Sequence, residues 1–181
     1  MNGASQREGS RWIQWLAFGA LAVAFYAFAQ FSNRSPLLGQ EAPELSLAVA
    51  AGAGSGGPSH VRLSDMSGSV VVLDFWASWC SACRKTTPIL NTLQEEFESR
   101  DISFYAVNVE PIEKRRVALA HEDFGTDFPT LHDRGGLAQR EYAVRVLPTV
   151  VVVGRDGVVE FASVRVPSES ELRDAISTAL N

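Results

Sequence analysis

The sequence predicts an α/β domain, with a central mixed sheet flanked by helices, that follows an N-terminal transmembrane helix. Residues 70–77, VVVLDFWA, form a nearly continuous apolar run, which is typical of a central strand covered on both faces. After this run, helix-like and strand-like segments alternate to the end of the chain. Residues 12–31 contain no charged residue over about the length that a helix needs to cross a bilayer.

The apolar segment at 12–31 is interpreted as a membrane anchor. Arg7 and Arg11 precede it and only Arg34 closely follows it, so the positive-inside rule places the N-terminus in the cytoplasm and the domain outside. In a bacterium this arrangement is a single-pass inner-membrane protein with its domain in the periplasm. The predicted parts are a cytoplasmic tail at 1–11, the anchor at 12–31, a linker at 32–37 and one domain at 38–181.

Two alternatives to a retained anchor stay open. Ala27-Phe28-Ala29 has the small-residue spacing of a signal-peptide cleavage site, and cleavage after Ala29 would release a soluble domain. The segment could also be a buried core helix, but it lacks the polar face that a helix at the surface of a core would carry.

The first part of the domain is predicted to be two short edge strands joined by a loop. The strands are expected at 45–48 and 60–63. Between them, residues 48–59, AVAAGAGSGGPS, are small, flexible and uncharged, which favours a surface loop over a regular element. The sequence assigns no function to this loop.

The rest of the domain is predicted from the spacing of its apolar residues and from its turn and cap signals. Ile89, Leu90, Leu93 and Phe97 recur at helical spacing, and Ser168 with Glu171 has the pattern of a capping box. A Gly-containing turn at 155–157 favours a hairpin. The expected elements are a helix at 80–99, a strand at 102–109, helices at 112–124 and 136–144, hairpin strands at 149–154 and 158–163, and a helix at 168–180.

The charge balance excludes one class of partner. From Ser32 onward the chain carries 14 Lys and Arg against 20 Asp and Glu, with both signs interspersed. Because the chain has no basic stripe or run, we do not expect it to bind nucleic acid. We expect a monomer that binds proteins.

The two cysteines are the chemically distinctive feature. Cys80 and Cys83 lie where the apolar strand meets the following helix, and a helix N-terminus stabilises the thiolate that attacks disulfides. Cys80 would then form a mixed disulfide with a substrate, and Cys83, one turn further in, would resolve it. Asp74, in the middle of the strand, is either a buried group with a raised pKa that takes a proton from Cys83, or an ordinary strand residue.

The segment WASWCSACRKTTPIL resembles the active-site segment of the thioredoxin superfamily, and particularly of its membrane-anchored TlpA-like and ResA-like branch. GQEAP at 39–43 is similar to the G-x-x-A-P of that branch, and VLPT at 146–149 resembles the superfamily's cis-proline loop. The resemblance covers roughly residues 38–181 and implies a thioredoxin-like fold.

The resemblance also implies roles for individual residues. Cys80 would be the nucleophile, Cys83 the resolving thiol and Asp74 the buried acid-base group. The peptide bond before Pro148 would be cis, leaving backbone groups of Leu147 free to pair with a substrate strand. Trp76 and Trp79 would pack around the site, with Trp79 nearer the surface. The implied substrate-binding residues are Trp79, Leu147, Pro148 and Thr149.

The expected activity is thiol–disulfide exchange with exported proteins, more readily as a reductase than as an oxidant, with no bound cofactor beyond the two cysteines. Reduction of apocytochrome cysteines during cytochrome c maturation and maintenance of metal-site thiols are the tasks that the resemblance implies. A membrane thiol–disulfide carrier would supply the electrons.

The sequence departs from the family pattern at two places, and one alternative function stays open. Ser-Ala separates the cysteines where many relatives have a proline, and Thr86 stands where some relatives have a glutamate. The alternative is a copper-binding metallochaperone-like module, because a C-x-x-C pair can hold Cu(I). His60, His121 and His132 show no ligand spacing that would complete a zinc site, and we expect no metal.

Overall fold

The computed structural model describes residues 15–23, 25, 36–52, 54 and 57–181. The chain divides into two units, residues 1–34 and 35–181. In the first unit, residues 15–23 and 25 are helical. No helix within the described ranges is long and apolar enough to span a membrane. The other residues of the expected anchor, 12–14, 24 and 26–31, lie outside the described residues, as does Ala29.

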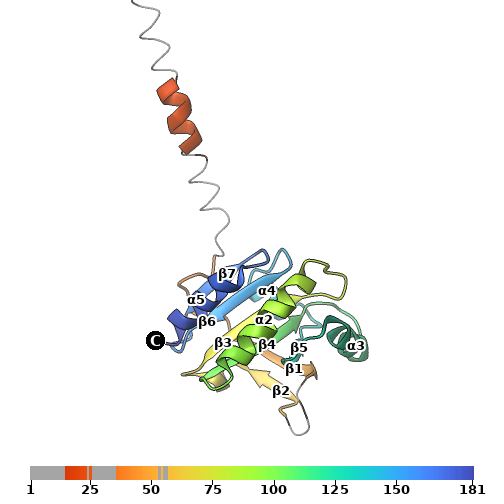
Figure 1. The fold of residues 1–181 in the computed structure, drawn as a ribbon. Helices are drawn as coiled ribbons and strands as arrows, with labels where there is room; N and C mark the ends of the chain where they lie inside the picture. The colour runs from red at the N-terminus through yellow and green to blue at the C-terminus, as the bar shows by residue number, and fades with distance from the viewer. Residues whose placement is uncertain (1–14, 24, 26–35, 53, 55–56) are drawn as a thin grey trace, which may run out of the picture. The chain divides into compact units, whose positions relative to one another are not determined.

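The second unit is built on one mixed seven-stranded sheet (Figure 1). Its spatial order is β2-β1-β5-β4-β3-β6-β7, with β3, β4 and β5 parallel to one another and β6 antiparallel to β3. The strands are β1 (Ser46–Ala51), β2 (His60–Arg62), β3 (Val70–Trp76), β4 (Ile102–Asn108), β5 (Thr130–His132), β6 (Thr149–Val153) and β7 (Val159–Ser163).

β3 is central because it can bury every one of its side chains. All seven of its residues are buried, and the side chains alternate between two apolar clusters on opposite faces of the sheet. Val70, Val72 and Trp76 belong to one cluster, whereas Val71, Leu73 and Phe75 belong to the other. The continuous apolar run in the sequence therefore corresponds to a strand covered on both faces, as predicted.

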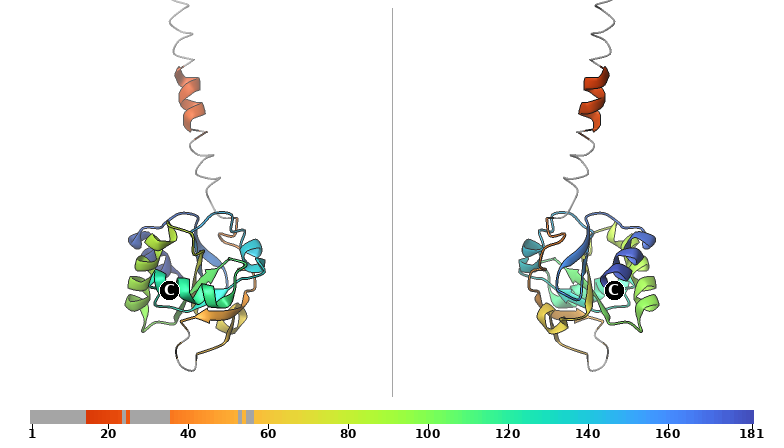
Figure 2. Two further views of the ribbon diagram at one scale, coloured as in Figure 1. Left: turned by 90° about the vertical axis from the view of Figure 1, so that its right-hand side faces the viewer. Right: turned by 90° about the vertical axis from the view of Figure 1, so that its left-hand side faces the viewer.

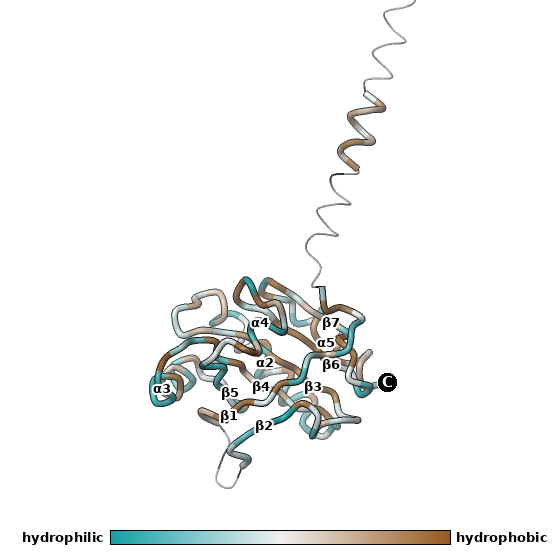
Figure 3. The backbone as a smooth tube through the Cα atoms, turned by 180° about the vertical axis from the view of Figure 1, so that it is seen from behind, coloured by the Kyte–Doolittle hydropathy of each residue, from teal (hydrophilic) through white to brown (hydrophobic). Residues whose placement is uncertain are grey.

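Helices cover both faces of the sheet, which Figure 2 shows edge-on. α2 and α5 pack on the first face through Leu90, Leu93, Leu172 and Ile176, and α4 covers the other face. In Figure 3 the strands of this sheet are mainly brown, the colour of hydrophobic residues. The helices are α2 (Cys83–Phe97), α3 (Lys114–Phe124), α4 (Leu137–Glu141) and α5 (Glu169–Ala179), with a 3-10 turn at Leu63–Met66.

The α/β class, the mixed sheet and the closing hairpin are confirmed, but several local predictions were wrong. α2 begins at Cys83 and not at Cys80, because residues 77–82 form a turn before the helix. β1 is not an edge strand, since it pairs with β2 on one side and β5 on the other. β5 was missed, because three residues are too few to show a pattern.

The small-residue loop is shorter than predicted. β1 continues to Ala51, so only residues 52–59 separate it from β2. Gly52 has a φ of 75° and lies against His121 of α3, where an added Cβ would come within 2.9 Å of the imidazole ring. A glycine is therefore required where this loop leaves β1.

The register of the three parallel strands determines where the site forms. Trp76, Asn108 and His132 end β3, β4 and β5 and lie side by side. The segments that follow these strands, at 77–82, 109–113 and 133–136, therefore start from one edge of the sheet. The turn before β6, with Pro148, reaches the same edge because β6 is antiparallel to β3.

Candidate active site

The turn between β3 and α2 carries the cysteine pair. The backbone N–H of Cys80 donates to the carbonyl oxygen of Ala77 at 3.0 Å, and that of Lys85 donates to Ala82 at 3.0 Å. Cys80 and Cys83 form a disulfide, with their Cα atoms 5.3 Å apart. The described residues contain no free cysteine.

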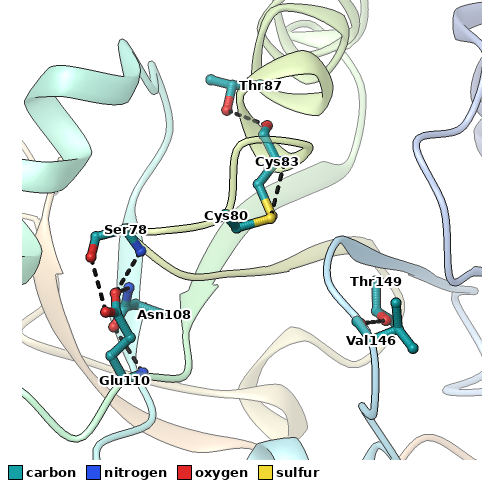
Figure 4. The surroundings of a disulfide bond; sticks show 8 residues. All are labelled: Ser78, Cys80, Cys83, Thr87, Asn108, Glu110, Val146 and Thr149. Atoms are coloured by element: carbon teal, nitrogen blue, oxygen red, sulfur yellow. Dashed lines mark hydrogen bonds between the residues drawn. A yellow bond between two sulfur atoms is a disulfide. The ribbon is translucent and has the colours of Figure 1, made fainter.

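The two sulfurs differ in their surroundings, as Figure 4 shows. Cys80 is 5% exposed and lies in the turn, whereas Cys83 is fully buried in the first turn of α2. The backbone N–H of Cys83 donates to Cys80 Sγ at 3.1 Å, so a free N–H group at the start of the helix points at the first cysteine. This arrangement favours negative charge on Cys80 and leaves Cys83 in an apolar environment.

The two tryptophans beside the cysteines have opposite environments. Trp79 is 72% exposed, directly before Cys80, whereas Trp76 is buried against Phe124 with ring centroids 4.6 Å apart. The expectation that Trp79 lies nearer the surface is confirmed.

Asp74 is buried on the same face of the sheet as Cys83. It alternates with Val72 and Trp76 in β3, and these two residues share an apolar cluster with both cysteines. Asp74 is 3% exposed, and its Oδ1 has no hydrogen-bond partner among the described residues. Burial raises the pKa of this carboxyl group well above its ordinary value, because the charged form loses its hydration.

Thr86 is a second buried polar group on this face. It is fully buried in α2, one turn after Cys83, and its Oγ1 has no partner in the part of the chain that the structure describes. A hydroxyl group cannot replace the carboxylate that some relatives carry at this position. Asp74 is the acid that the sequence predicted on this buried face.

The loop before β6 has the predicted backbone form. The Leu147–Pro148 peptide bond is cis, as the resemblance implied. Leu147 packs against the cluster that contains both cysteines, and Pro148 is buried. Thr149 is buried, and its hydroxyl group donates to the carbonyl oxygen of Val146 at 2.7 Å. Its side chain therefore makes a hydrogen bond within the loop. Val146, 54% exposed, is the surface residue of this loop, and the sequence reasoning did not single it out.

A carboxylate that the sequence reasoning missed lies beside the turn (Figure 4). Glu110, two residues after β4, is 7% exposed, and its Oε2 accepts from the backbone N–H of Ser78 at 2.6 Å. Its Oε1 accepts from the Ser78 hydroxyl group at 2.9 Å. An acidic residue just after a central strand was the only available signal, since the contact depends on the register of β3 and β4.

The described residues hold no group of three or more His, Cys, Asp or Glu side chains arranged to bind a metal ion. His132, at the end of β5, contacts the carbonyl oxygen of Glu110 through Nε2 at 3.0 Å, and His121 contacts Thr130 through Nδ1 at 2.9 Å. Burial lowers the pKa of His121, because the imidazolium form loses hydration.

The pattern of the AhpC/TSA family matches residues 38–162, which is well over half of the chain. The chain belongs to the AhpC/TSA family. The match begins where the predicted domain begins and includes β1 to β6, both cysteines and the cis-proline loop. Within this family the fold is thioredoxin-like, as expected from the sequence.

Relatives and solved structures agree with this assignment. The chain is 31% identical over 140 residues to the thioredoxin-like protein YneN of Bacillus subtilis, covering 76% of this chain and 78% of that protein. It is 32% identical over 146 residues to the thiol-disulfide oxidoreductase ResA of Geobacillus thermodenitrificans, covering 80% and 79%. A crystal structure from Chlorobium tepidum, described as the thiol:disulfide interchange protein DsbE, matches with a TM-score of 0.69 and 31% identity, covering 80% of this chain and 98% of that one.

A C-x-x-C disulfide at the end of a central strand, facing a cis-proline loop in this family, makes the chain a thiol–disulfide oxidoreductase. In such an enzyme the electrons pass between sulfurs, since a thiolate attacks a disulfide directly.

Proposed function

We propose that this oxidoreductase reduces disulfides of exported proteins, with Cys80 as the nucleophile and Cys83 as the resolving thiol. The observation that carries the proposal is the asymmetry of the disulfide. Cys80 is 5% exposed, lies in the turn beside exposed Trp79 and accepts the N–H of Cys83, whereas Cys83 is fully buried in the first turn of α2. A substrate sulfur can approach the turn from solvent and meets Cys80 first.

The reaction transfers two electrons and two protons. The Cys80 thiolate attacks one substrate sulfur, so a Cys80–substrate bond forms and the substrate disulfide breaks. The leaving thiolate takes a proton from water, which replaces the proton that Cys80 released when it ionised. Cys83 then gives up its proton and attacks Cys80 Sγ. The Cys80–substrate bond breaks, the second substrate thiol leaves, and the Cys80–Cys83 disulfide remains.

Asp74 is the proposed proton acceptor for Cys83. It shares a buried face with Cys83, and its free Oδ1 can accept a proton. Burial raises the pKa of this carboxyl group, which makes its carboxylate a stronger base toward the Cys83 thiol than that of an exposed aspartate.

Burial of the pair supports the reductase direction. Ionisation of one thiol stabilises the reduced form of such a pair, and an apolar environment disfavours that charge. Cys80 and Cys83 are 5% and 0% exposed within one apolar cluster. A reduced pair that is poorly stabilised passes its electrons to a substrate more readily.

The proposed location is the outer side of a bacterial inner membrane, with residues 12–31 as the anchor. The support is the uncharged sequence and the arginines before it. A membrane thiol–disulfide carrier would recharge the pair. The proposed substrates are protein disulfides formed by cysteines of the kind found in apocytochromes c or exported metal sites. The exposed side chains of Trp79 and Val146, with backbone groups of Leu147, would contact the substrate chain.

The experiment that tests the direction is the equilibrium reduction potential of the pair in glutathione or dithiothreitol buffers, followed by tryptophan fluorescence. A value near roughly −270 mV supports a reductase, whereas a value near about −120 mV would make the protein an oxidant. The roles of the two cysteines are tested separately. Cys80→Ser should abolish exchange and Cys83→Ser should accumulate mixed disulfides with substrate proteins. Accumulation with Cys80→Ser alone would reverse the assignment.

A further inference from the structure

Glu110 holds the turn that carries Cys80. Its carboxylate accepts the backbone N–H of Ser78 at 2.6 Å and the Ser78 hydroxyl group at 2.9 Å. These contacts join β4 to the turn across 32 positions of sequence, two residues before Cys80. Both oxygens of the Glu110 side chain therefore accept hydrogen bonds from Ser78.

Glu110 is itself fixed in place by the ends of the neighbouring strands. The side-chain amide of Asn108 donates to Glu110 Oε2 at 3.1 Å, and the backbone N–H of Glu110 donates to Asn108 Oδ1 at 3.1 Å. His132 of β5 contacts the carbonyl oxygen of Glu110 at 3.0 Å. Asn108 is fully buried, so this network cannot move without disturbing the sheet.

The Glu110 carboxylate is a fixed, nearly buried negative charge beside the turn that carries the reacting sulfur. Water screens it little, because Glu110 is 7% exposed and Cys80 is 5% exposed. A like charge disfavours the Cys80 thiolate and therefore the reduced state of the pair. The N–H of Cys83, which donates to Cys80 Sγ, acts in the opposite direction.

We propose that Glu110 is a positioning residue that sets the redox equilibrium of the Cys80–Cys83 pair, its charge making the pair more reducing. The proposal rests on the proposed function, since it concerns the same disulfide. The Ser78 hydroxyl group and backbone N–H hold the charge in place and partly neutralise it.

The test is the equilibrium of the full chain with glutathione at pH 9, above the ordinary pKa of a thiol, about 8.5. In this reaction the Cys80–Cys83 disulfide and two glutathione thiols become the dithiol and one glutathione disulfide. Glu110→Gln keeps the size of the side chain and removes the charge. The equilibrium constant for reduction should rise roughly tenfold, which corresponds to about 30 mV for a two-electron couple.

Two further variants separate the charge from a structural role. Ser78→Ala removes one hydrogen bond but keeps the carboxylate and the backbone N–H bond. The charge is then less neutralised, so the equilibrium constant should fall by about two- to threefold, opposite in sign to Glu110→Gln. Glu113→Gln is the matched control, because it neutralises an exposed glutamate in the same connection and should change the constant by less than twofold.

The outcomes distinguish the two proposals. If the parent chain does not equilibrate with glutathione, the proposed function fails. Two results with an equilibrating parent would overturn this inference. In the first, the equilibrium constant of Glu110→Gln equals that of Glu113→Gln. In the second, Glu110→Gln and Ser78→Ala shift the constant in the same direction, so that Glu110 only supports the structure of the turn. Near-UV circular dichroism checks that Glu110→Gln is folded. If Glu110→Gln is not folded, the test rests on Ser78→Ala, and an equilibrium constant that rises or stays unchanged in that variant overturns the inference.

Discussion

Replacing Asp74 with asparagine tests the free-energy cost of keeping a carboxyl group inside the sheet. Asp74 is 3% exposed, its Oδ1 has no partner among the described residues, and burial raises its pKa. In the unfolded chain the same group ionises near its ordinary pKa of about 3.9. Above that pH the folded state binds more protons than the unfolded state, so the free energy of unfolding falls as the pH rises.

The size of the effect follows from the width of that pH window. Each pH unit between the unfolded and the folded pKa costs about 1.4 kcal/mol of stability. From pH 4 to pH 7 the parent therefore loses at most about 4 kcal/mol through this one group. Asparagine does not titrate, so Asp74→Asn should gain stability relative to the parent over this interval, with the difference largest at pH 7.

The assay is urea denaturation of both proteins at several pH values between 4 and 7, with the disulfide intact. Asp65→Asn is the control, because it removes an exposed aspartate from the turn before β3 and should leave the pH dependence unchanged. If the stabilities of the parent and Asp74→Asn run parallel across the interval, the carboxyl group does not carry a raised pKa and the argument from burial is refuted.

Three further substitutions test the packing around the site. Leu90→Ala should lower the free energy of unfolding by about 3 kcal/mol in urea, because Leu90 is fully buried between α2 and the sheet; a loss below about 1 kcal/mol would contradict this. Tyr142→Phe should cost about 1 kcal/mol, since the Tyr142 hydroxyl group donates to Pro43 at 2.7 Å; a neutral result would mean that water replaces this bond. Ser168→Ala should also cost about 1 kcal/mol by removing the capping box of α5, and a thermal melt unchanged from the parent would argue against that cap.

Local sequence patterns were sufficient for the elements that carry their own signal. β3 has a continuous apolar run, α5 has the Ser168 and Glu171 capping box, and the β6–β7 hairpin has a Gly-containing turn, and each was predicted close to its observed bounds. The cysteine pair and the cis bond before Pro148 were also found from short motifs.

Elements with little local signal were misjudged. β5 has three residues and is stabilised by its pairing with β4 and β1, which no pattern within the segment records. α2 starts three residues later than its apolar spacing indicated, because the turn at 77–82 is held by contacts from other parts of the chain. Such contacts can determine where an element begins even though the element's own residues show no pattern that indicates it.

The sequence by itself determined the class of the domain, its reactive pair and the acid in the central strand, because burial periodicity and short motifs are properties of neighbouring residues. Only the tertiary structure decided what surrounds that pair. The register of β3, β4 and β5 brings Glu110 to Ser78 across 32 positions. The cis-proline loop before β6 leaves Thr149 buried and Val146 exposed. Pairing between strands that are distant in the chain determines which residues surround the cysteines. One of these residues is Glu110, whose charge we propose tunes the disulfide.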